Sequence, residues 1–260
     1  KLDYASNLDS INDLIFSHNI SDERYIFIQA DLSNLNATKE AIALSDPDIV
    51  FHLAAESHVD KSISNPEGFL ESNIIGTFNL LEAIKLHWQT LTSKRKSQFR
   101  LLHVSTDEVF GSIESDELFS EDSPYKPRSP YSATKAASDH LVKAWYHTYK
   151  LPVLVTNSSN NFGPWQFPEK LIPLIIFNGI NNKPIDIYGD GSNIRDWIFV
   201  EDHISFLLRV MIRGNIGESY CIGGGQQKSN NQIVEIICDL LDEKNKVNAP
   251  HIRLKKFVKD

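Results

Sequence analysis

A tyrosine and a lysine spaced four residues apart, Tyr131 and Lys135, have the side chains in this chain that are best suited to moving a proton. They follow Ser129 and Pro130, which are typical first residues of a helix, so both side chains are expected on one helix face. An ammonium next to a phenol lowers the pKa of the phenol, and a phenolate can accept a proton from an alcohol. An isolated pair with this spacing more often just shares a surface, so the interpretation depends on other residues.

Two adjacent acids, Asp107 and Glu108, indicate a second kind of proton transfer. They and Thr106 directly follow a predicted apolar strand at residues 100–105, and ligands of open parallel sheets bind at the carboxyl ends of the strands. Neighbouring carboxyl groups in a cleft can have different pKa values, so that one donates a proton while the other accepts one. Such a pair suits the elimination of water, although the same three residues also fit a turn or a helix cap.

Small and amide side chains follow two further predicted strands. Residues 49–53 lead into the small residues of 54–57, where a backbone could closely approach a flat cofactor. Residues 151–156 lead into an amide-rich segment at 157–161, which either orients polar ligand atoms or satisfies a loop. Asp31 follows another predicted strand, and it could accept a hydrogen bond from an adenine amino group or simply begin a turn.

Short β-branched runs alternate with longer amphipathic stretches, a pattern that predicts an α/β fold with a parallel sheet. After residue 163 the sequence becomes rich in Pro, Gly and Asn, which indicates a smaller C-terminal lobe. The predicted strands are 25–30, 49–53, 100–105, 151–156, 185–188, 197–200, 219–222 and 252–257. The predicted helices are 37–44, 69–90, 132–149, 201–213 and 232–244.

The composition excludes several classes of function. A formal net charge of −8 argues against a surface that binds nucleic acid, because that surface needs clustered basic residues. Apolar runs stay well short of the roughly 20 residues that span a bilayer. The 2 cysteines and 9 histidines have no metal-ligand spacing, so we predict no metal site, no disulfide framework and a reducing, cytoplasmic setting.

Four motifs together resemble the extended short-chain dehydrogenase/reductase family, over essentially the whole chain. They are Tyr-x-x-x-Lys, Leu-Ala-Ala-Glu-Ser at 53–57, Ser-Thr-Asp-Glu-Val at 105–109 and Asn-Asn-Phe-Gly-Pro at 160–164. Within the family the sequence is similar to nucleotide-sugar 4,6-dehydratases, most distinctively at 106–108, 167–173 and 195–197. Sugar epimerases of the same superfamily carry small or apolar residues where Asp107 and Glu108 stand. The resemblance implies a Rossmann-like, doubly wound parallel sheet, NAD as cofactor and dTDP-glucose as substrate.

The resemblance also implies a role for individual residues. Tyr131 would take the proton of the sugar C4 hydroxyl with Thr106 steadying the oxygen, Glu108 would remove the C5 proton, and Asp107 would protonate the departing C6 hydroxyl. Lys135 would hold the nicotinamide ribose and lower the pKa of Tyr131. The implied NAD contacts are Asp31, Leu32, Leu53, Ala54, Ala55, Glu56, Ser57, Ser72, Tyr131, Lys135 and Asn161. The implied substrate contacts are Ser57, Thr106, Asn160, Lys170, Leu171, Asp186, Ile187, Tyr188, Arg195 and Asn230, with Arg195 suited to a diphosphate.

By the same resemblance, residues 1–163 form the NAD-binding domain and residues 164–260 mainly a substrate-binding lobe. The family's first strand, its glycine-rich loop and its C-terminal elements have no counterpart in this sequence. We therefore expect a fragment that neither folds stably nor turns over substrate, because a parallel sheet without its innermost strand leaves backbone groups unpaired. The helices at 69–90 and 132–149 are expected to pair across a homodimer.

Two other functions stay open. One is a related NAD-dependent dehydratase or epimerase of UDP- or GDP-sugars, which product analysis with each nucleotide sugar would identify. The other is a non-catalytic module that binds NAD or a nucleotide sugar, which would be favoured if Tyr131→Phe changed no rate.

Overall fold

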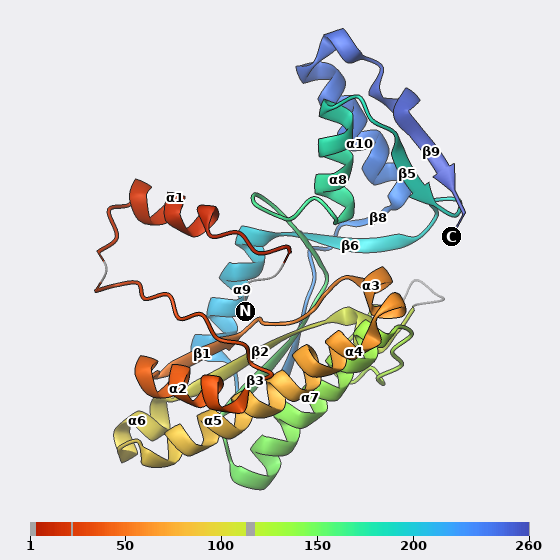
Figure 1. The fold of residues 1–260 in the computed structure, drawn as a ribbon. Helices are drawn as coiled ribbons and strands as arrows, with labels where there is room; N and C mark the ends of the chain where they lie inside the picture. Colours follow the sequence, from red (N-terminus) through yellow and green to blue (C-terminus); the bar gives the residue numbers. More distant parts are fainter. Residues whose placement is uncertain (1–3, 22, 113–117, 260) are drawn as a thin grey trace. The chain divides into compact units, whose positions relative to one another are not determined.

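The computed structural model describes residues 4–21, 23–112 and 118–259, and the chain forms two compact units. The first comprises Lys1–Ser158 and Ser205–Ile222, and the second comprises Ser159–Ile204 and Gly223–Asp260. Residues 205–222 follow much of the second unit in sequence, yet they belong to the first because their strand extends its sheet (Figure 1).

The first unit contains a sheet whose described strands are all parallel, in the order β1-β2-β3-β7. These strands are β1 (Ile49–His52), β2 (Arg100–Thr106), β3 (Val153–Ser158) and β7 (Ser219–Ile222). Every residue of β3 is buried, as expected for a strand with a neighbour on both sides and helices over both faces. The parallel α/β fold predicted from the sequence is confirmed. The carboxyl ends of β2 and β3 meet at one edge, where Thr106 pairs with Ser158.

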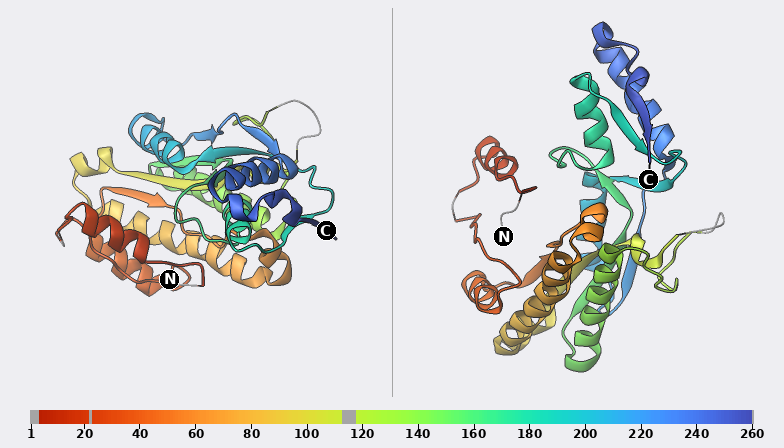
Figure 2. Two further views of the ribbon diagram at one scale, coloured as in Figure 1. Left: turned by 90° about the horizontal axis from the view of Figure 1, so that it is seen from above. Right: turned by 45° about the vertical axis from the view of Figure 1, so that its right-hand side comes forward.

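Helices cover both faces of this sheet (Figure 2). One face carries α2 (Leu35–Ser45), α5 (Gly76–Thr90) and α7 (Pro130–Tyr149), and the opposite face carries the 205–213 part of α9 (Val200–Arg213). Buried Leu81, Ile84, Phe99 and Val142 pack with the strands in the core. The remaining described elements of this unit are α1 (Asp9–Ser17), α3 (Val59–Ser64), α4 (Pro66–Phe69), η1 (Leu70–Ile75), α6 (Ser93–Gln98) and η2 (Asp107–Phe110).

The helix predicted at 69–90 is not one continuous α-helix. It begins as α4, widens into the π-helical turn η1 at Leu70–Ile75 and continues as α5. The π turn coincides with Asn73, whose side chain and carbonyl oxygen both bind other segments of the unit. Such π turns occur mostly as single turns inside α-helices and frequently at functional sites.

The strand predicted at 25–30 was wrong. This segment is extended but belongs to no sheet, and Ile26 and Phe27 are 70% and 46% exposed. A strand needs a neighbour to pair with its backbone. Within the described part of the chain, β1 is the outer strand of the sheet and pairs with β2 alone.

The second unit is built from two small sheets and two helices around a separate apolar core. One sheet has the order β4-β6-β8 and the other pairs β5 with β9. Its core includes Ile175, Ile187, Trp197 and Val234. The elements are β4 (Asn160–Phe162), α8 (Leu171–Ile180), β5 (Ile185–Tyr188), β6 (Ile194–Phe199), β8 (Gln227–Ser229), α10 (Asn230–Lys244), η3 (Lys246–Asn248), η4 (His251–Leu254) and β9 (Lys255–Val258). The strand predicted at 252–257 thus divides into a 3-10 turn and a shorter strand.

Among the helices that the structure describes, none combines the length and the apolar character needed to cross a bilayer.

Candidate active site

Thr106, Asp107 and Glu108 form the junction between β2 and the 3-10 turn η2. The Thr106 hydroxyl accepts a hydrogen bond from the Glu108 amide at 3.2 Å and donates one to Asp107 Oδ1 at 3.3 Å. Buried Val109 and Phe110 anchor the turn in the first unit. The capping interpretation of these residues is therefore correct for Thr106. The cap also holds both acids, half-buried, at the carboxyl edge of the sheet.

Tyr131 lies in the first turn of α7, which Ser129 begins with a capping box to Ser132. The phenol is half-buried, and it lies close enough to Thr106, Glu108 and Asp107 for all three to influence its pKa. Burial, followed by the charge of Glu108, raises the pKa of Tyr131 above its ordinary value. The structure thus brings together four of the predicted catalytic residues, namely Thr106, Asp107, Glu108 and Tyr131.

Lys135 departs from its predicted role toward Tyr131. Its ammonium is buried and donates a hydrogen bond to the Val104 carbonyl oxygen at 2.9 Å. Burial lowers the pKa of Lys135 to about 8, while the nearby carboxylate of Asp139 opposes that shift. The expectation that Lys135 lowers the pKa of Tyr131 is wrong for this structure, because burial and Glu108 raise that pKa instead. The predicted contact of Lys135 with a nicotinamide ribose stays a prediction.

The segment after β1, residues 53–57, is held by an amide that the sequence analysis did not identify. Asn73 accepts a hydrogen bond from the Glu56 amide at 2.8 Å and donates to the Glu56 carbonyl oxygen at 3.0 Å. The same side chain donates to Thr134 of α7 at 3.0 Å. Asn73 therefore ties the predicted cofactor segment to the helix that carries Tyr131. The signal available in the sequence was an amide next to Ser72 within a helical pattern, and its burial is known only from the structure.

Removing this amide tests its structural role. We expect Asn73→Ala to lower the free energy of unfolding by roughly 1–3 kcal/mol, because the Glu56 amide and carbonyl lose their partner in a half-buried place. Denaturant unfolding measures the change. The matched control is Asn181→Ala, which removes an exposed amide that donates to the Phe177 carbonyl oxygen. If both variants lost the same free energy of unfolding, Asn73 would not have the structural role inferred here.

The predicted cofactor residues Asp31 and Leu32 lie in a local turn, and Ser72 lies in the π-helical turn η1. Asp31 Oδ1 accepts hydrogen bonds from the Ser33 amide at 3.0 Å and hydroxyl at 2.8 Å. The carbonyl oxygens of Leu32 and Ser33 accept from Asn79 Nδ2 at 2.8 and 2.9 Å. The turn that the local sequence allowed at Asp31 is present, and its adenine contact stays a prediction.

These residues fit a flat cofactor. Leu53 is 57% exposed and Ala54 is exposed at the carboxyl end of β1, so apolar surface is open there to a planar ring. Buried side-chain amides hold the backbone of both predicted cofactor segments. Asn73 binds residues 53–57 at Glu56, and Asn79 binds the turn after Asp31 at Leu32. The described residues contain no group of three side chains that could hold a metal ion.

The predicted substrate residues of the second unit lie on different elements. Asn160 lies on β4, next to the predicted cofactor residue Asn161. Lys170 immediately precedes α8, Leu171 begins α8, and Asn230 begins α10. Alternation along β5 exposes Asp186 and Tyr188 but buries Ile187 in the core, so a ligand could reach Ile187 only through its backbone.

Arg195 is exposed on β6, directly opposite Lys228 of the antiparallel strand β8. Side chains of such a pair lie on the same face of the sheet, and two cations facing each other repel. An anion bound between them would relieve this repulsion. The sequence analysis identified Arg195 and missed Lys228, because the pairing register is a property of the fold.

Comparisons with known proteins agree with this geometry. The family model described as GDP-mannose 4,6 dehydratase matches residues 1–258. The dTDP-glucose 4,6-dehydratase of Neisseria gonorrhoeae is 51% identical over 244 residues, which cover 94% of this chain and 69% of that protein. The dTDP-glucose 4,6-dehydratase of Haemophilus influenzae is 49% identical over 265 residues, 100% of this chain and 77% of that protein.

Solved structures lead to the same family. The dTDP-glucose 4,6-dehydratase of Bacillus anthracis in complex with NAD superposes with a TM-score of 0.82 at 38% identity, covering 100% of this chain and 74% of that one. DesIV, the dTDP-glucose 4,6-dehydratase of Streptomyces venezuelae with NAD bound, gives a TM-score of 0.87 at 36% identity and covers 100% and 73%. Because the family model matches residues 1–258 and relatives about 50% identical cover nearly the whole chain, this chain belongs to the GDP-mannose 4,6 dehydratase family.

Proposed function

We propose that this protein converts dTDP-glucose to dTDP-4-keto-6-deoxyglucose with NAD as its cofactor, a lyase reaction of deoxysugar biosynthesis. The observation that carries the proposal is the meeting of Tyr131 with Thr106, Asp107 and Glu108 at the carboxyl edge of the sheet. Removal of water from a sugar needs a base for the alcohol, a base for carbon and an acid for the leaving hydroxyl, and these side chains supply all three.

The cofactor would be held mainly by the first unit, which we propose as the NAD-binding unit. The residues that would contact it are Asp31, Leu32, Leu53, Ala54, Ala55, Glu56, Ser57, Ser72, Tyr131, Lys135 and, on β4, Asn161. When bound, NAD supplies a positively charged ring that takes a hydride from C4 of the hexose and gives it back at C6. A positive charge near a phenol favours its ionised form, so we expect Tyr131, whose pKa is raised in the free protein, to ionise more readily in the loaded enzyme.

Four proton transfers then fall to the protein. Tyr131 accepts the proton of the C4 hydroxyl, while the Thr106 hydroxyl donates a hydrogen bond to that oxygen. Glu108 removes the C5 proton, which the C4 ketone makes acidic. Asp107 gives its proton to the C6 hydroxyl as it leaves as water. As C6 gains its hydride, the protonated Glu108 returns a proton to C5, which completes the 4-keto-6-deoxy sugar. Tyr131 then loses its extra proton and Asp107 regains one by exchange with solvent, so that each group is ready for the next turnover.

Epimerisation is the main alternative, because the UDP-glucuronic acid 4-epimerase of Bacillus cereus superposes with a TM-score of 0.78 at 28% identity. Asp107 and Glu108 favour dehydration, since an epimerase has no water to eliminate. We expect the whole protein to form a 4-keto-6-deoxy sugar from dTDP-glucose faster than from UDP- or GDP-sugars, measured by mass spectrometry of the products. An epimerised sugar that keeps all its oxygen atoms would overturn the assignment.

Arg195 and Lys228 are proposed to bind the diphosphate of the substrate. Arg195→Gln should raise KM by roughly 10- to 100-fold with a smaller effect on kcat, because charge-assisted hydrogen bonds contribute about 1.5–3 kcal/mol. Lys228→Gln should raise KM less, since a lysine donates as a point charge. Arg209→Gln, an exposed arginine on α9, is the control and should leave KM unchanged. Equal KM values for the Arg195 variant and the control would exclude the diphosphate site.

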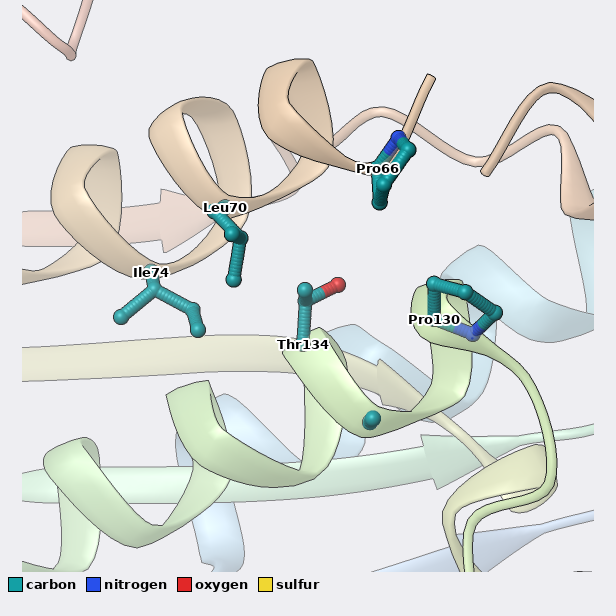
Figure 3. Close-up of a pocket in the computed structure, with 6 residues that line it drawn as sticks. Pro66, Leu70, Ile74, Pro130 and Thr134 are labelled. Atoms are coloured by element: carbon teal, nitrogen blue, oxygen red, sulfur yellow. The ribbon is translucent and has the colours of Figure 1, made fainter. Parts of the chain in front are cut away.

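We also infer a homodimer in the cytoplasm, formed through the helices of the first unit. Exposed apolar residues on η1 and α5 include Leu70, Ile75, Phe78 and Leu86. An almost wholly apolar pocket opens between α4, η1 and the start of α7 (Figure 3). It is lined by Pro66, Leu70, Ile74, Pro130, Ala133 and Thr134. Burial against a second copy would remove this surface from water. Sedimentation analysis at working concentration should show twice the monomer mass, and a monomer would exclude the dimer.

A further inference from the structure

A second cluster of ionisable groups lies directly behind the proposed catalytic residues. Its centre is Asp139, which is fully buried on α7, one turn after Lys135. Asp139 Oδ1 accepts a hydrogen bond from His103 Nε2 at 3.1 Å, and Oδ2 accepts from Tyr125 at 2.8 Å and from Asn157 Nδ2 at 3.0 Å. The roles proposed for the reaction use none of these four residues.

The cluster is connected to both parts of the proposed site. Asn157 Nδ2, which donates to Asp139, also donates to the Thr106 carbonyl oxygen at 3.2 Å. His103 lies one residue before Val104, whose carbonyl oxygen accepts from the Lys135 ammonium. Asp139 therefore binds β2 at His103, just before the carbonyl group that accepts from Lys135. Through Asn157 it also binds β2 at Thr106, where the turn with Asp107 and Glu108 begins.

The buried ammonium of Lys135 needs a compensating charge. Histidines face it from two strands, His52 on β1 and His103 on β2, and burial lowers the pKa of each, so both are neutral at neutral pH. Burial disfavours the charged form of Asp139, but the hydrogen bond from His103 and the charge of Lys135 hold its pKa below the usual range. The phenols of Tyr125 and Tyr131 both have raised pKa values and stay neutral. Glu108 and Asp107 raise the pKa of Tyr131, whereas the causes that set the pKa of Lys135 are burial and the carboxylate of Asp139.

We propose that Asp139 is a positioning residue: its buried carboxylate keeps the Lys135 ammonium charged and aligned with β2, and through Asn157 it fixes the main chain at Thr106. It touches neither substrate nor cofactor. Breaking a buried charge pair by removing one member is costly, because the remaining charge is left without compensation. The consequence for catalysis rests on the proposed function, in which the charged form of Lys135 holds the cofactor.

The test compares Asp139→Asn with the unchanged protein in two measurements. The first follows the titration of Lys135 by NMR of ¹³C-methylated lysines, with Lys135→Arg used to assign the signal. Because burial lowers the pKa of Lys135 to about 8, we expect a midpoint near that pH in the unchanged protein. In the variant we expect the midpoint to fall by about one unit or more. The second measures NAD affinity against pH. Since the ammonium is lost as pH rises, the alkaline loss of affinity should move to lower pH by the same amount.

Asp242→Asn is the matched control. Asp242 accepts a hydrogen bond from a buried histidine, His251, in the second unit, so the variant also removes the carboxylate of an Asp–His pair. It should leave both the titration of Lys135 and the pH dependence of NAD binding unchanged. Asp139→Glu keeps the charge and should restore a midpoint near that of the native protein. An unchanged Lys135 midpoint in folded Asp139→Asn would overturn the proposal.

Two results remain decisive if other parts fail. If Asp139→Asn does not fold, the Lys135 midpoint of the native protein decides the question. A midpoint below about pH 6 would overturn the proposal, because a buried lysine without a compensating charge titrates in that range. A midpoint near pH 8 would support it. Should the protein not dehydrate dTDP-glucose, the lysine titration still tests the role of Asp139. The failure of the inference and the failure of the proposed function are therefore separate outcomes.

Discussion

Tyr131→Phe should lower kcat for dehydration of dTDP-glucose by roughly 10²- to 10⁴-fold, the usual contribution of a positioned acid or base. The phenol is the base proposed for the C4 hydroxyl, and without it the first step stops. Neither the 4-ketohexose nor the final product should then appear when quenched reactions are analysed by mass spectrometry. Solvent deuterium should also stay absent from C5, because that proton becomes acidic only after oxidation at C4.

The loss should be catalytic rather than structural. The ring of Tyr131 packs edge-on against Phe69, with centroids 6.4 Å apart, and phenylalanine keeps this contact. Tyr149→Phe on the same helix is the control, because Tyr149 is 43% exposed near the end of α7. A Tyr131 variant with the kcat of this control would leave a binding module as the better description of the protein.

Glu108→Gln should lower kcat over a similar range, roughly 10²- to 10⁴-fold, but it should block a later step. Tyr131 can still take the C4 proton, so the 4-ketohexose should accumulate up to one per active site. Without a base at C5, neither exchange with solvent deuterium nor loss of water should follow. The measurement is mass spectrometry of the hexose after quenching in deuterated buffer.

Asp107→Asn distinguishes the role of Asp107 from that of Glu108. With Glu108 intact, C5 should still exchange with solvent, while loss of the C6 hydroxyl slows because its proton donor is gone. Asp122→Asn, an exposed acid outside the site, serves as the control and should behave like the unchanged protein. If Glu108→Gln exchanged C5 freely and Asp107→Asn did not, the two roles would have to be reversed.

The pH dependence of the free protein offers a check without substrate. Burial and Glu108 raise the pKa of Tyr131, so its phenol should stay neutral at pH values where an exposed tyrosine ionises. Ultraviolet difference spectra of native protein against Tyr131→Phe follow this group. Addition of NAD should shift the ionisation of Tyr131 to lower pH.

Much of the fold could be predicted from local sequence patterns. The helix expected at 132–149 is present as Pro130–Tyr149, because Ser129 and Pro130 favour a helix start through local contacts within its first turn. The strand expected at 219–222 is present as Ser219–Ile222. The segment 25–30 has an equally strong strand pattern and forms none, because its backbone finds no neighbouring strand among the described residues.

Residue types and spacing by themselves determined the family, the α/β class and the candidate chemistry of Thr106, Asp107, Glu108 and Tyr131, because motifs and amphipathic periods are local properties of a chain. Tertiary structure alone decided what surrounds those groups. Packing places Asn73 and Asp139 beside them, pairs Arg195 with Lys228, and raises the pKa of Tyr131 that a neighbouring lysine was expected to lower. Burial and distance set a pKa, and both arise only when segments distant in sequence come together.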